Sequence, residues 1–223
     1  MIGFHIHPRR RQVAADIVAR FAGLPVANIS DVMSRMAAGG AHLRPMHDGA
    51  PMAGPALTVK TRPGDNLMVH KALNLAQPGD IIVVDAGGDL TNAIIGEIMT
   101  TYARRRGIGG IVIHGAIRDS QALRQSSFPV YAAGVTHRGP YKDGPGEINA
   151  AIALDGMIIE PGDLIVGDAD GLLCVPFDRV DAVYQAAAAK QAAEARTFEE
   201  IAAGTLDTGW IDARLAELKC GGI

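Results

Sequence analysis

The residues best suited to chemistry are two adjacent charged side chains, Arg118 and Asp119, which follow a strongly apolar run. Residues 111–113 of that run are typical of a buried β-strand. An arginine guanidinium binds carboxylates through two parallel hydrogen bonds, and aspartate is a preferred ligand of hard divalent cations. The pair also fits a helix that begins at Ser120, with Asp119 as its N-cap and Arg118 paired with a surface carboxylate.

A second candidate, Gly96-Glu97, follows a glycine-rich loop that comes after another apolar run. The sequence places Gly96 at the start of a helix that ends near Arg106, where free backbone amides bind anions. The alternative is a flexible turn in which Glu97 favours the helix dipole. In a parallel strand–helix–strand unit the strand ends share one edge of the sheet, so this loop and Arg118-Asp119 are expected to face one cleft. Such a cleft would suit a small 2-oxo acid with a metal ion.

The middle of the chain alternates short β-rich runs with helical patterns, which is typical of an α/β domain with a partly parallel sheet. The expected strands are 56–60, 81–85, 110–114, 129–133, 157–159, 164–166 and 172–175. The expected helices are 66–75, 96–106 and 120–125, and the close spacing of the last three strands favours antiparallel hairpins. Pro-Gly-Asp occurs at 63–65, 78–80 and 161–163, as turn chemistry before a helix or a strand.

Helical segments flank this core on both sides. They are 12–22, a helix capped by Ser30 or Asp31 that runs to about Met36, a long Ala- and Glu-rich helix 178–203 and a short helix 211–218. A long terminal helix of modest apolar content often packs on a neighbouring subunit. We expect a single domain over residues 1–223, made of a helical extension at 1–50, an α/β core at 51–177 and C-terminal helices at 178–223.

Composition argues against several classes of protein. The chain has 223 residues and a formal net charge of −3, which does not suggest a nucleic-acid binder. Its two cysteines, Cys174 and Cys220, give neither a disulfide framework nor metal-ligand spacing. No run approaches the roughly 18 apolar residues of a membrane span, and the first residues lack a signal-peptide pattern. We therefore expect a cytoplasmic protein without a membrane partner.

The segment around the two candidates resembles the signature of a known family. Gly96-Glu97-Ile98-Met99 is followed by Arg106-Gly107-x-x-Gly110-x-Val112-Ile113-x-Gly115-x-x-Arg118-Asp119. This pattern is similar to that of the class II 4-hydroxy-4-methyl-2-oxoglutarate / 4-carboxy-4-hydroxy-2-oxoadipate aldolases, a family that includes the regulator of ribonuclease activity A. The most specific motif of the family is an acidic residue, twenty residues and then Arg-Asp, which this chain matches. The likeness covers most of the chain, although His114 and Ala122 replace acidic residues found in family members.

The resemblance implies a swivelling β/β/α sandwich with a mixed sheet, assembled as a homotrimer or homohexamer. It implies that Asp119 ligates Mg²⁺ or Mn²⁺ and that Glu97 hydrogen-bonds a water on the metal. Arg118 and the amides of Gly96, Glu97, Ile98 and Met99 would hold the carboxylate and carbonyl of the substrate.

In this family an acidic residue of the long C-terminal helix also reaches the site of a neighbouring subunit. Glu194 is the best match for that residue, with Glu199 and Glu200 as alternatives. The structural alternative is that Glu194 simply lies on a solvated face of the helix.

The implied activity is metal-dependent cleavage of either aldol to pyruvate and a second 2-oxo acid, with oxaloacetate decarboxylation as a side activity. The competing hypothesis is a regulatory binding protein without catalysis, and the joint presence of Glu97, Arg118 and Asp119 favours the enzyme. A methyltransferase is disfavoured because no S-adenosylmethionine loop is evident. The weaker candidates for the pocket, each of which could instead be structural or solvated, are Asn66, His70, His137 and Lys142. Asp168 and Asp170 are expected to form a turn. Trp210 is expected to lie in a core or an interface.

Overall fold

The structure is a computed structural model that describes residues 2–36 and 41–222. Its strands are β1 (Phe4–Ile6), β2 (Arg44–Pro45), β3 (Met52–Thr61), β4 (Ile81–Asp85), β5 (Ala93–Ile95), β6 (Gly110–Ile117), β7 (Val130–Val135), β8 (Gly146–Ile148), β9 (Ile152–Leu154), β10 (Met157–Ile159), β11 (Leu164–Asp168) and β12 (Gly171–Val175). A large mixed sheet runs in the order β1-β8-β3-β4-β6-β7-β2, while β5 pairs with β6, and β11 links β12 to β3. β9 and β10 form a separate antiparallel hairpin.

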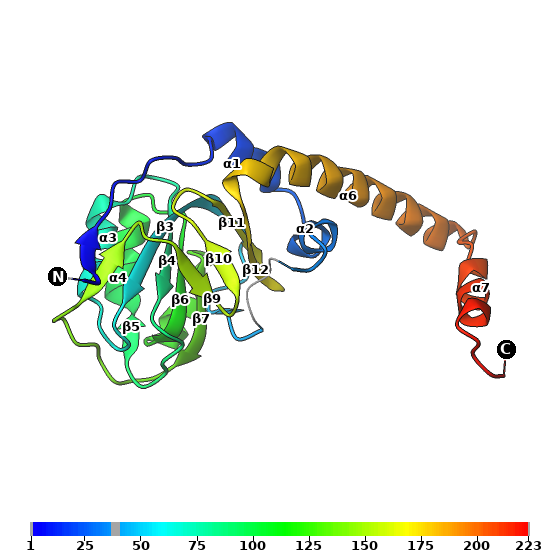
Figure 1. Cartoon of the computed structure of the whole chain (residues 1–223). Helices are drawn as coiled ribbons and strands as arrows, with labels where there is room; N and C mark the ends of the chain where they lie inside the picture. Colours follow the sequence, from blue (N-terminus) through cyan, green and yellow to red (C-terminus); the bar gives the residue numbers. More distant parts are fainter. Residues whose placement is uncertain (1, 37–40, 223) are drawn as a thin grey trace.

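The helices are α1 (Ala15–Phe21), α2 (Val26–Val32), α3 (Leu67–Leu75), α4 (Glu97–Arg105), α5 (Ser120–Arg124), α6 (Val180–Ala203) and α7 (Gly209–Glu217), with a 3₁₀ turn at Phe177–Arg179. Helices α3, α4 and α5 cover one face of the sheet (Figure 1). The parallel strands β3, β4, β6 and β7 are joined by these helices, as the alternating pattern predicts.

Each central strand is apolar on both faces because both faces of the sheet are covered. In β4, Ile82 and Val84 pack against the helices, whereas Ile81 and Val83 pack into a second core under β9, β10 and β12. Successive side chains of a strand point to opposite faces, so a continuous apolar run is what a doubly covered strand requires.

A third core fills the space between β11, β12 and the helices α1, α2 and α6. The layers are therefore helices, main sheet, a smaller β layer and a second set of helices. This arrangement confirms the predicted α/β class, a β/β/α sandwich with a mixed sheet, helices in the N-terminal extension and a long C-terminal helix.

The N-terminal extension differs from the prediction in two ways. Ser30 and Asp31 lie inside α2, which begins after Pro25 and ends at Val32, so they do not cap a helix that runs to Met36. Proline fixes the backbone ahead of the first helical turn, and this earlier start outweighed the capping signal. The extension also contains the short strands β1 and β2, which pair with β8 and β7.

The C-terminal part of the chain leaves the body of the molecule. Figure 1 shows α6 running outward, with α7 at its far end. The buried side chains of α6 are Val180 and Ala187, in its first half, and α7 has none. No helix in the described residues is both long and apolar enough to cross a membrane.

Candidate active site

The short strand β5 brings the two predicted motifs side by side. It pairs in parallel with the end of β6, so Ile95 lies opposite Ile117. The amide of Arg118 donates a hydrogen bond of 3.0 Å to the carbonyl of Ile95. Gly96 and Arg118 therefore leave the same edge of the sheet together, as the strand–helix–strand argument predicted.

Asp119 adopts a left-handed backbone conformation, with φ of 57° and ψ of 35°. Its carboxylate does not cap its own helix α5, as one interpretation of the sequence had it. Instead, Oδ2 accepts a hydrogen bond of 2.9 Å from the amide of Glu97, the first residue of α4. Aspartate is among the residues that tolerate this conformation, and here it turns the carboxylate back toward the other motif.

Gly96 allows this close approach because it has no side chain. A Cβ at this position would overlap the Asp119 carboxylate and would lie 2.9 Å from Cγ of Arg118. The backbone of Gly96 is extended, so the requirement for glycine comes from space and not from its dihedral angles.

If Arg118 and Asp119 act in catalysis, Gly96→Ala is predicted to lower kcat/KM by about 100-fold, because a shift of roughly 1 Å in catalytic groups has an effect of this size. The substituted methyl group must push Arg118 and Asp119 out of place. Steady-state kinetics would measure the loss, and Gly23→Ala is the control because a Cβ there meets nothing within 4 Å. Equal activity of the two variants would show that the contact is unimportant.

The guanidinium of Arg118 is available to a ligand. Among the described residues, Asp119 is the one carboxylate within ion-pair distance, with Nε to Oδ2 at 3.8 Å. The Arg118 side chain is 43 % exposed. An arginine without a close hydrogen-bonded partner, next to a helix N-terminus, is suited to bind a carboxylate.

Two hollows meet at Arg118 and Asp119. The first is a cavity of about 300 Å³, lined by Asn66, His70, Ala93, Ile94, Ile95, Gly96, Ile98, Met99, Arg118, Asp119, Gly139, Pro140 and Lys142. The second is a wider cleft of about 660 Å³, lined by Glu97, Arg118, Asp119, Ser120, Gln121, Ala122, Gln125, Val135, Thr136 and His137. The structure thus brings together the site residues predicted from positions 96–99 and 118–119, with Glu97 on the cleft side.

The weaker candidates divide between the two hollows. Asn66, His70 and Lys142 line the cavity, and His137 lines the cleft. Asn66 is buried, and its amide nitrogen donates to the carbonyl of Ile94 at 2.9 Å. Its Oδ1 has no hydrogen-bond partner among the described residues. Sequence reasoning missed Gly139 and Pro140, whose dipeptide indicates a turn but gives no sign that it would wall a site.

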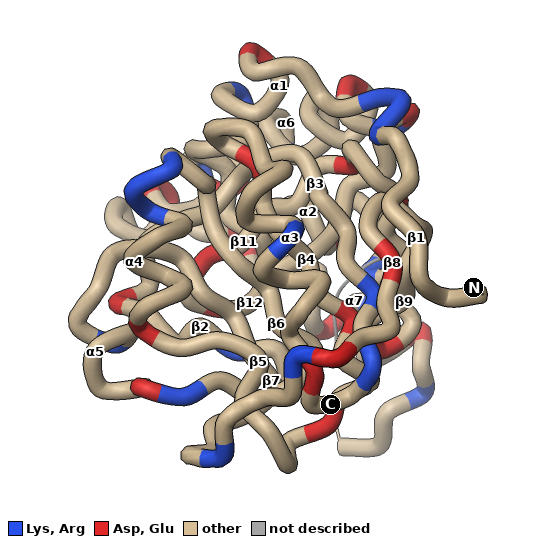
Figure 2. Tube along the Cα trace, turned by 90° about the vertical axis from the view of Figure 1, so that its left-hand side faces the viewer, with Lys and Arg blue, Asp and Glu red and all other residues tan. Residues whose placement is uncertain are grey.

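The charges around the cavity favour an anion without making the whole face basic. Arg118, Lys142 and the N-terminus of α4 contribute positive potential. Figure 2 shows basic and acidic residues interspersed over the face that carries α3, α4 and α5. The positive potential that would favour an anion is therefore local to the cavity.

Burial, and then the charge of Lys142, lower the pKa of His70 below its ordinary 6.5. A lowered pKa in the folded state disfavours protonation, so this group supports stability above pH 6.5 and loses that contribution as the pH falls. We predict that Lys142→Met raises the His70 pKa part of the way back, because burial remains. An NMR titration of the imidazole would measure this, with Lys219→Met as the control, and an unchanged pKa would contradict the coupling.

The residues at the cavity fit a divalent cation that keeps most of its water. Among the described residues no group of three or more His, Cys, Asp or Glu side chains could hold a metal ion. Asp119 uses Oδ2 for the Glu97 amide, and no hydrogen bond to its Oδ1 is found in the described chain. A single carboxylate oxygen beside a cavity suits Mg²⁺, which usually binds one or two carboxylates plus waters and substrate oxygens.

Within one copy of the chain, Glu194 of α6 lines neither the cavity nor the cleft. Its carboxylate accepts a hydrogen bond of 2.7 Å from Asn28 of α2 and pairs with Lys190 at 3.1 Å. These contacts lower the pKa of Glu194, the Asn28 hydrogen bond most. The role of Glu194 in a neighbouring copy stays a prediction.

Comparison with known proteins shows the family of the chain. The family described as RraA-like (Aldolase/RraA) matches residues 26–174. The chain belongs to the RraA-like family. The matched range contains the whole edge at which Gly96, Arg118 and Asp119 meet.

Individual proteins also resemble the chain over most of its length. One from Halalkalibacterium halodurans, provisionally named 4-hydroxy-4-methyl-2-oxoglutarate aldolase, is 41 % identical over 81 % of this chain and 86 % of its own. A structure of an uncharacterized protein from Pseudomonas syringae has a TM-score of 0.79 at 26 % identity, over 87 % of this chain and 96 % of its own. The RNA-processing inhibitor RraA from Thermus thermophilus has a TM-score of 0.63 at 30 % identity, over 68 % and 92 %.

Proposed function

We propose that this protein is a divalent-metal-dependent aldolase. It would cleave 4-hydroxy-4-methyl-2-oxoglutarate or 4-carboxy-4-hydroxy-2-oxoadipate to pyruvate and a second 2-oxo acid. The observation that carries the proposal is the meeting of Arg118, Asp119 and the N-terminus of α4 at one cavity. The name of the Halalkalibacterium halodurans relative supports the choice of substrate class.

Arg118 and the first turn of α4 would bind the carboxylate that all these substrates share. The amide of Glu97 already donates to Asp119, and that of Met99 donates to the carbonyl of Gly96 at 3.1 Å. The amide of Ile98 has no such partner in the described chain and is therefore the free donor of this turn. One amide and a guanidinium fork would fix the orientation of the oxo acid.

Asp119 would hold Mg²⁺ or Mn²⁺ beside the bound oxo acid. When bound, the cation supplies Lewis-acid stabilisation of negative charge on the 2-oxo oxygen. Glu97 faces the adjoining cleft. With Glu194 of a neighbouring copy it would position the base or the water that takes the proton of the C4 hydroxyl as the carbon–carbon bond breaks. Decarboxylation of oxaloacetate generates the same charge and is an expected side activity.

Pyruvate release is the experiment that tests this function. The purified protein would be offered each of the two substrates with Mg²⁺, with Mn²⁺ and with excess EDTA. Turnover that depends on metal would support the proposal and rank the substrates. Absence of turnover on both, in a protein that binds metal, would show that the proposed substrates are wrong.

A regulatory binding protein is the second candidate, because one structural relative is titled an RNA-processing inhibitor. A protein that acts by covering a partner needs no metal and no cavity. Arg118 and Asp119 substitutions would then leave partner binding intact, whereas they should abolish turnover in an aldolase.

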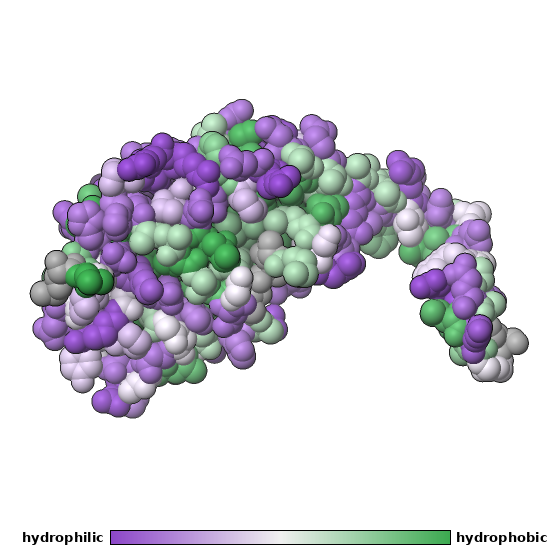
Figure 3. Space-filling view, in the orientation of Figure 1, coloured by the Kyte–Doolittle hydropathy of each residue, from purple (hydrophilic) through white to green (hydrophobic). Residues whose placement is uncertain are grey.

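We also propose that the protein is a homo-oligomer, a trimer or a hexamer, in which the arm formed by α6 and α7 packs on a neighbouring copy. Phe198, Ile201, Trp210, Ile211 and Leu218 are exposed along this arm. Figure 3 shows apolar residues among polar ones on the part that projects from the body. Large apolar side chains in such numbers mark an interaction surface.

The single tryptophan reports on this packing. Trp210 is 68 % exposed in the isolated chain. We predict that its fluorescence emission in the assembled protein is shifted to the blue and returns to the red when dilution dissociates the oligomer. Light scattering would give the assembly state at each concentration. Emission typical of an exposed indole in an intact oligomer would place the arm outside the interface.

A further inference from the structure

One wall of the cavity is a strap, residues 137–145, that follows β7 and carries no regular structure in its centre. Gly139, Pro140 and Lys142 of the strap line the cavity. A Cβ on Gly139 would lie 3.2 Å from a terminal nitrogen of Arg118, so the strap backbone passes close to the guanidinium and a side chain at this position would crowd it. The position of the strap therefore limits where Arg118 can lie.

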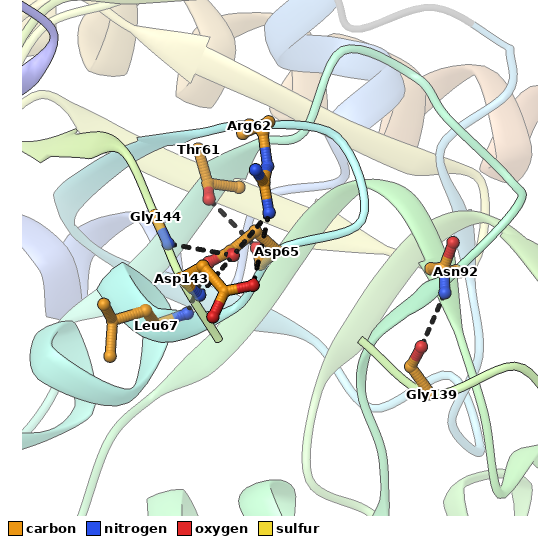
Figure 4. A network of polar contacts seen from close by, with 8 residues as sticks. All are labelled: Thr61, Arg62, Asp65, Leu67, Asn92, Gly139, Asp143 and Gly144. Carbon is orange, nitrogen blue, oxygen red and sulfur yellow. Dashed lines mark hydrogen bonds and ion pairs between the residues drawn. The ribbon is translucent and has the colours of Figure 1, made fainter. Parts of the chain in front are cut away.

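Asp65, outside the cavity lining, holds the strap from behind. It is fully buried, and its Oδ2 accepts hydrogen bonds from the amides of Asp143 at 2.7 Å and Gly144 at 2.9 Å. Arg62 donates to the same oxygen at 3.2 Å, and Oδ1 accepts from the amide of Leu67 at 2.9 Å. Figure 4 shows the carboxylate enclosed by these donors.

Further contacts fasten the part of the strap that precedes Asp143. The amide of Tyr141 donates to the carbonyl of Gly64 at 2.8 Å, next to Asp65 in the chain. At the other end, the side-chain amide of Asn92 donates to the carbonyl of Gly139 at 2.6 Å (Figure 4). Hydrogen bonds thus attach the strap both to the loop before α3 and to the loop before β5.

The other two Pro-Gly-Asp motifs use their aspartates differently. Asp80 and Asp163 are also buried, and each accepts a hydrogen bond from the amide three residues before it, Gln77 at 2.8 Å and Glu160 at 2.9 Å. Each also accepts a hydrogen bond from outside its turn, from the guanidinium of Arg9 for Asp80 at 2.7 Å and from the amide of Phe177 for Asp163 at 2.9 Å. Neither of these donors belongs to the strap, whereas the Asp65 carboxylate binds two strap amides nearly eighty positions away.

We propose that Asp65 is a positioning residue of the site: by binding the strap amides it fixes the cavity wall beside Arg118 and so determines how tightly a 2-oxo acid binds. This inference rests on the proposed function, because it takes the cavity to be the substrate site. Asp65 would thus affect the binding of the 2-oxo acid without touching it, through its hydrogen bonds to the strap amides.

Asp65→Asn tests the proposal, with Asp163→Asn as the matched control. Asparagine keeps the shape but has a single accepting oxygen and no charge, so its NH2 group must face either the strap amides or the amide of Leu67. We expect hydrogen exchange of the amides of Asp143 and Gly144 to quicken by about tenfold or more, as loss of local protection predicts. The dissociation constant of oxalate, used as a 2-oxo acid analogue with Mg²⁺, should rise by about tenfold, while kcat changes less than KM.

Asp163→Asn should cost stability of the same order but leave strap exchange and oxalate binding as in the unmodified protein. The proposal fails if Asp65→Asn changes oxalate binding no more than Asp163→Asn does, or if strap exchange is unaltered. Should Asp65→Asn fail to fold, Asn92→Ala releases the strap at Gly139 and is expected to weaken oxalate binding in the same direction. Exchange and binding need no turnover, so an inactive but oxalate-binding protein would count against the proposed reaction and not against the role of Asp65.

Discussion

Asp119→Asn is expected to reduce metal-dependent pyruvate release by about three orders of magnitude, because the substitution removes the charge that Asp119 would offer to a divalent cation. The amide oxygen of asparagine can still accept the hydrogen bond from Glu97, which is 2.9 Å long in the structure. The start of α4 should therefore keep its cap while the site loses its cation. Calorimetric titration with Mn²⁺ would show the weakened metal binding directly.

Asp48→Asn is the matched control, because Asp48 also accepts a backbone amide, that of Ala50 at 3.0 Å, and lies on an exposed loop. It should retain full activity and metal affinity. Full metal-dependent turnover in Asp119→Asn would show that the cation is held elsewhere. A large fall in thermal stability of the variant would instead indicate that the carboxylate serves the fold.

Arg118→Lys is expected to lower kcat/KM by about 100-fold, mostly through KM, although the positive charge is kept. Lysine cannot form the two parallel hydrogen bonds of a guanidinium, and each hydrogen bond to a charged group is worth roughly 1.5–3 kcal/mol. The guanidinium also lies close to the strap at Gly139, a position that a flexible ammonium would not hold. Binding of pyruvate or oxalate, measured by calorimetry, should weaken by a similar factor.

Arg124→Lys provides the comparison for this substitution, since Arg124 is exposed at the end of α5 and lies in neither hollow. Its activity should be unaffected. If Arg118→Lys were equally harmless, the carboxylate of the substrate would have to bind to another group, with Lys142 the nearest candidate in the cavity.

The sequence predicted the central fold well because strong local signals agree with burial there. Strands 81–85 and 157–159 have the predicted bounds, and the helices expected at 66–75 and 96–106 differ by one residue at their ends. The short strands β1, β2, β5, β8 and β9 were missed. All five have three residues or fewer. Three of them, β1, β2 and β8, form by pairing with a partner far along the chain, which no local pattern records.

The site shows the same division between local and distant signals. Placing Gly96 and Arg118 at one edge needed only the rule for parallel strands, and the structure confirms their proximity through a strand that the sequence did not reveal. The left-handed Asp119 and its bond to Glu97 could not be predicted, because they depend on the close approach of two segments at Gly96. The strap and its hydrogen bonds to Asp65 could not be predicted either, because they join positions 65 and 143–144, which are far apart in the sequence.

Exchange of the methyl protons of pyruvate in D₂O tests the central claim most directly, because it does not depend on which aldol is the natural substrate. A site that binds pyruvate and stabilises charge on its 2-oxo oxygen should remove and return protons at the adjacent carbon, the reverse half of the cleavage reaction. We predict that the methyl signal in the proton NMR spectrum disappears with Mg²⁺ or Mn²⁺, and that it persists with EDTA or in Asp119→Asn. No exchange in the metal-loaded protein, at a pyruvate concentration shown to saturate it, would contradict the assignment of this cavity as an aldolase active site.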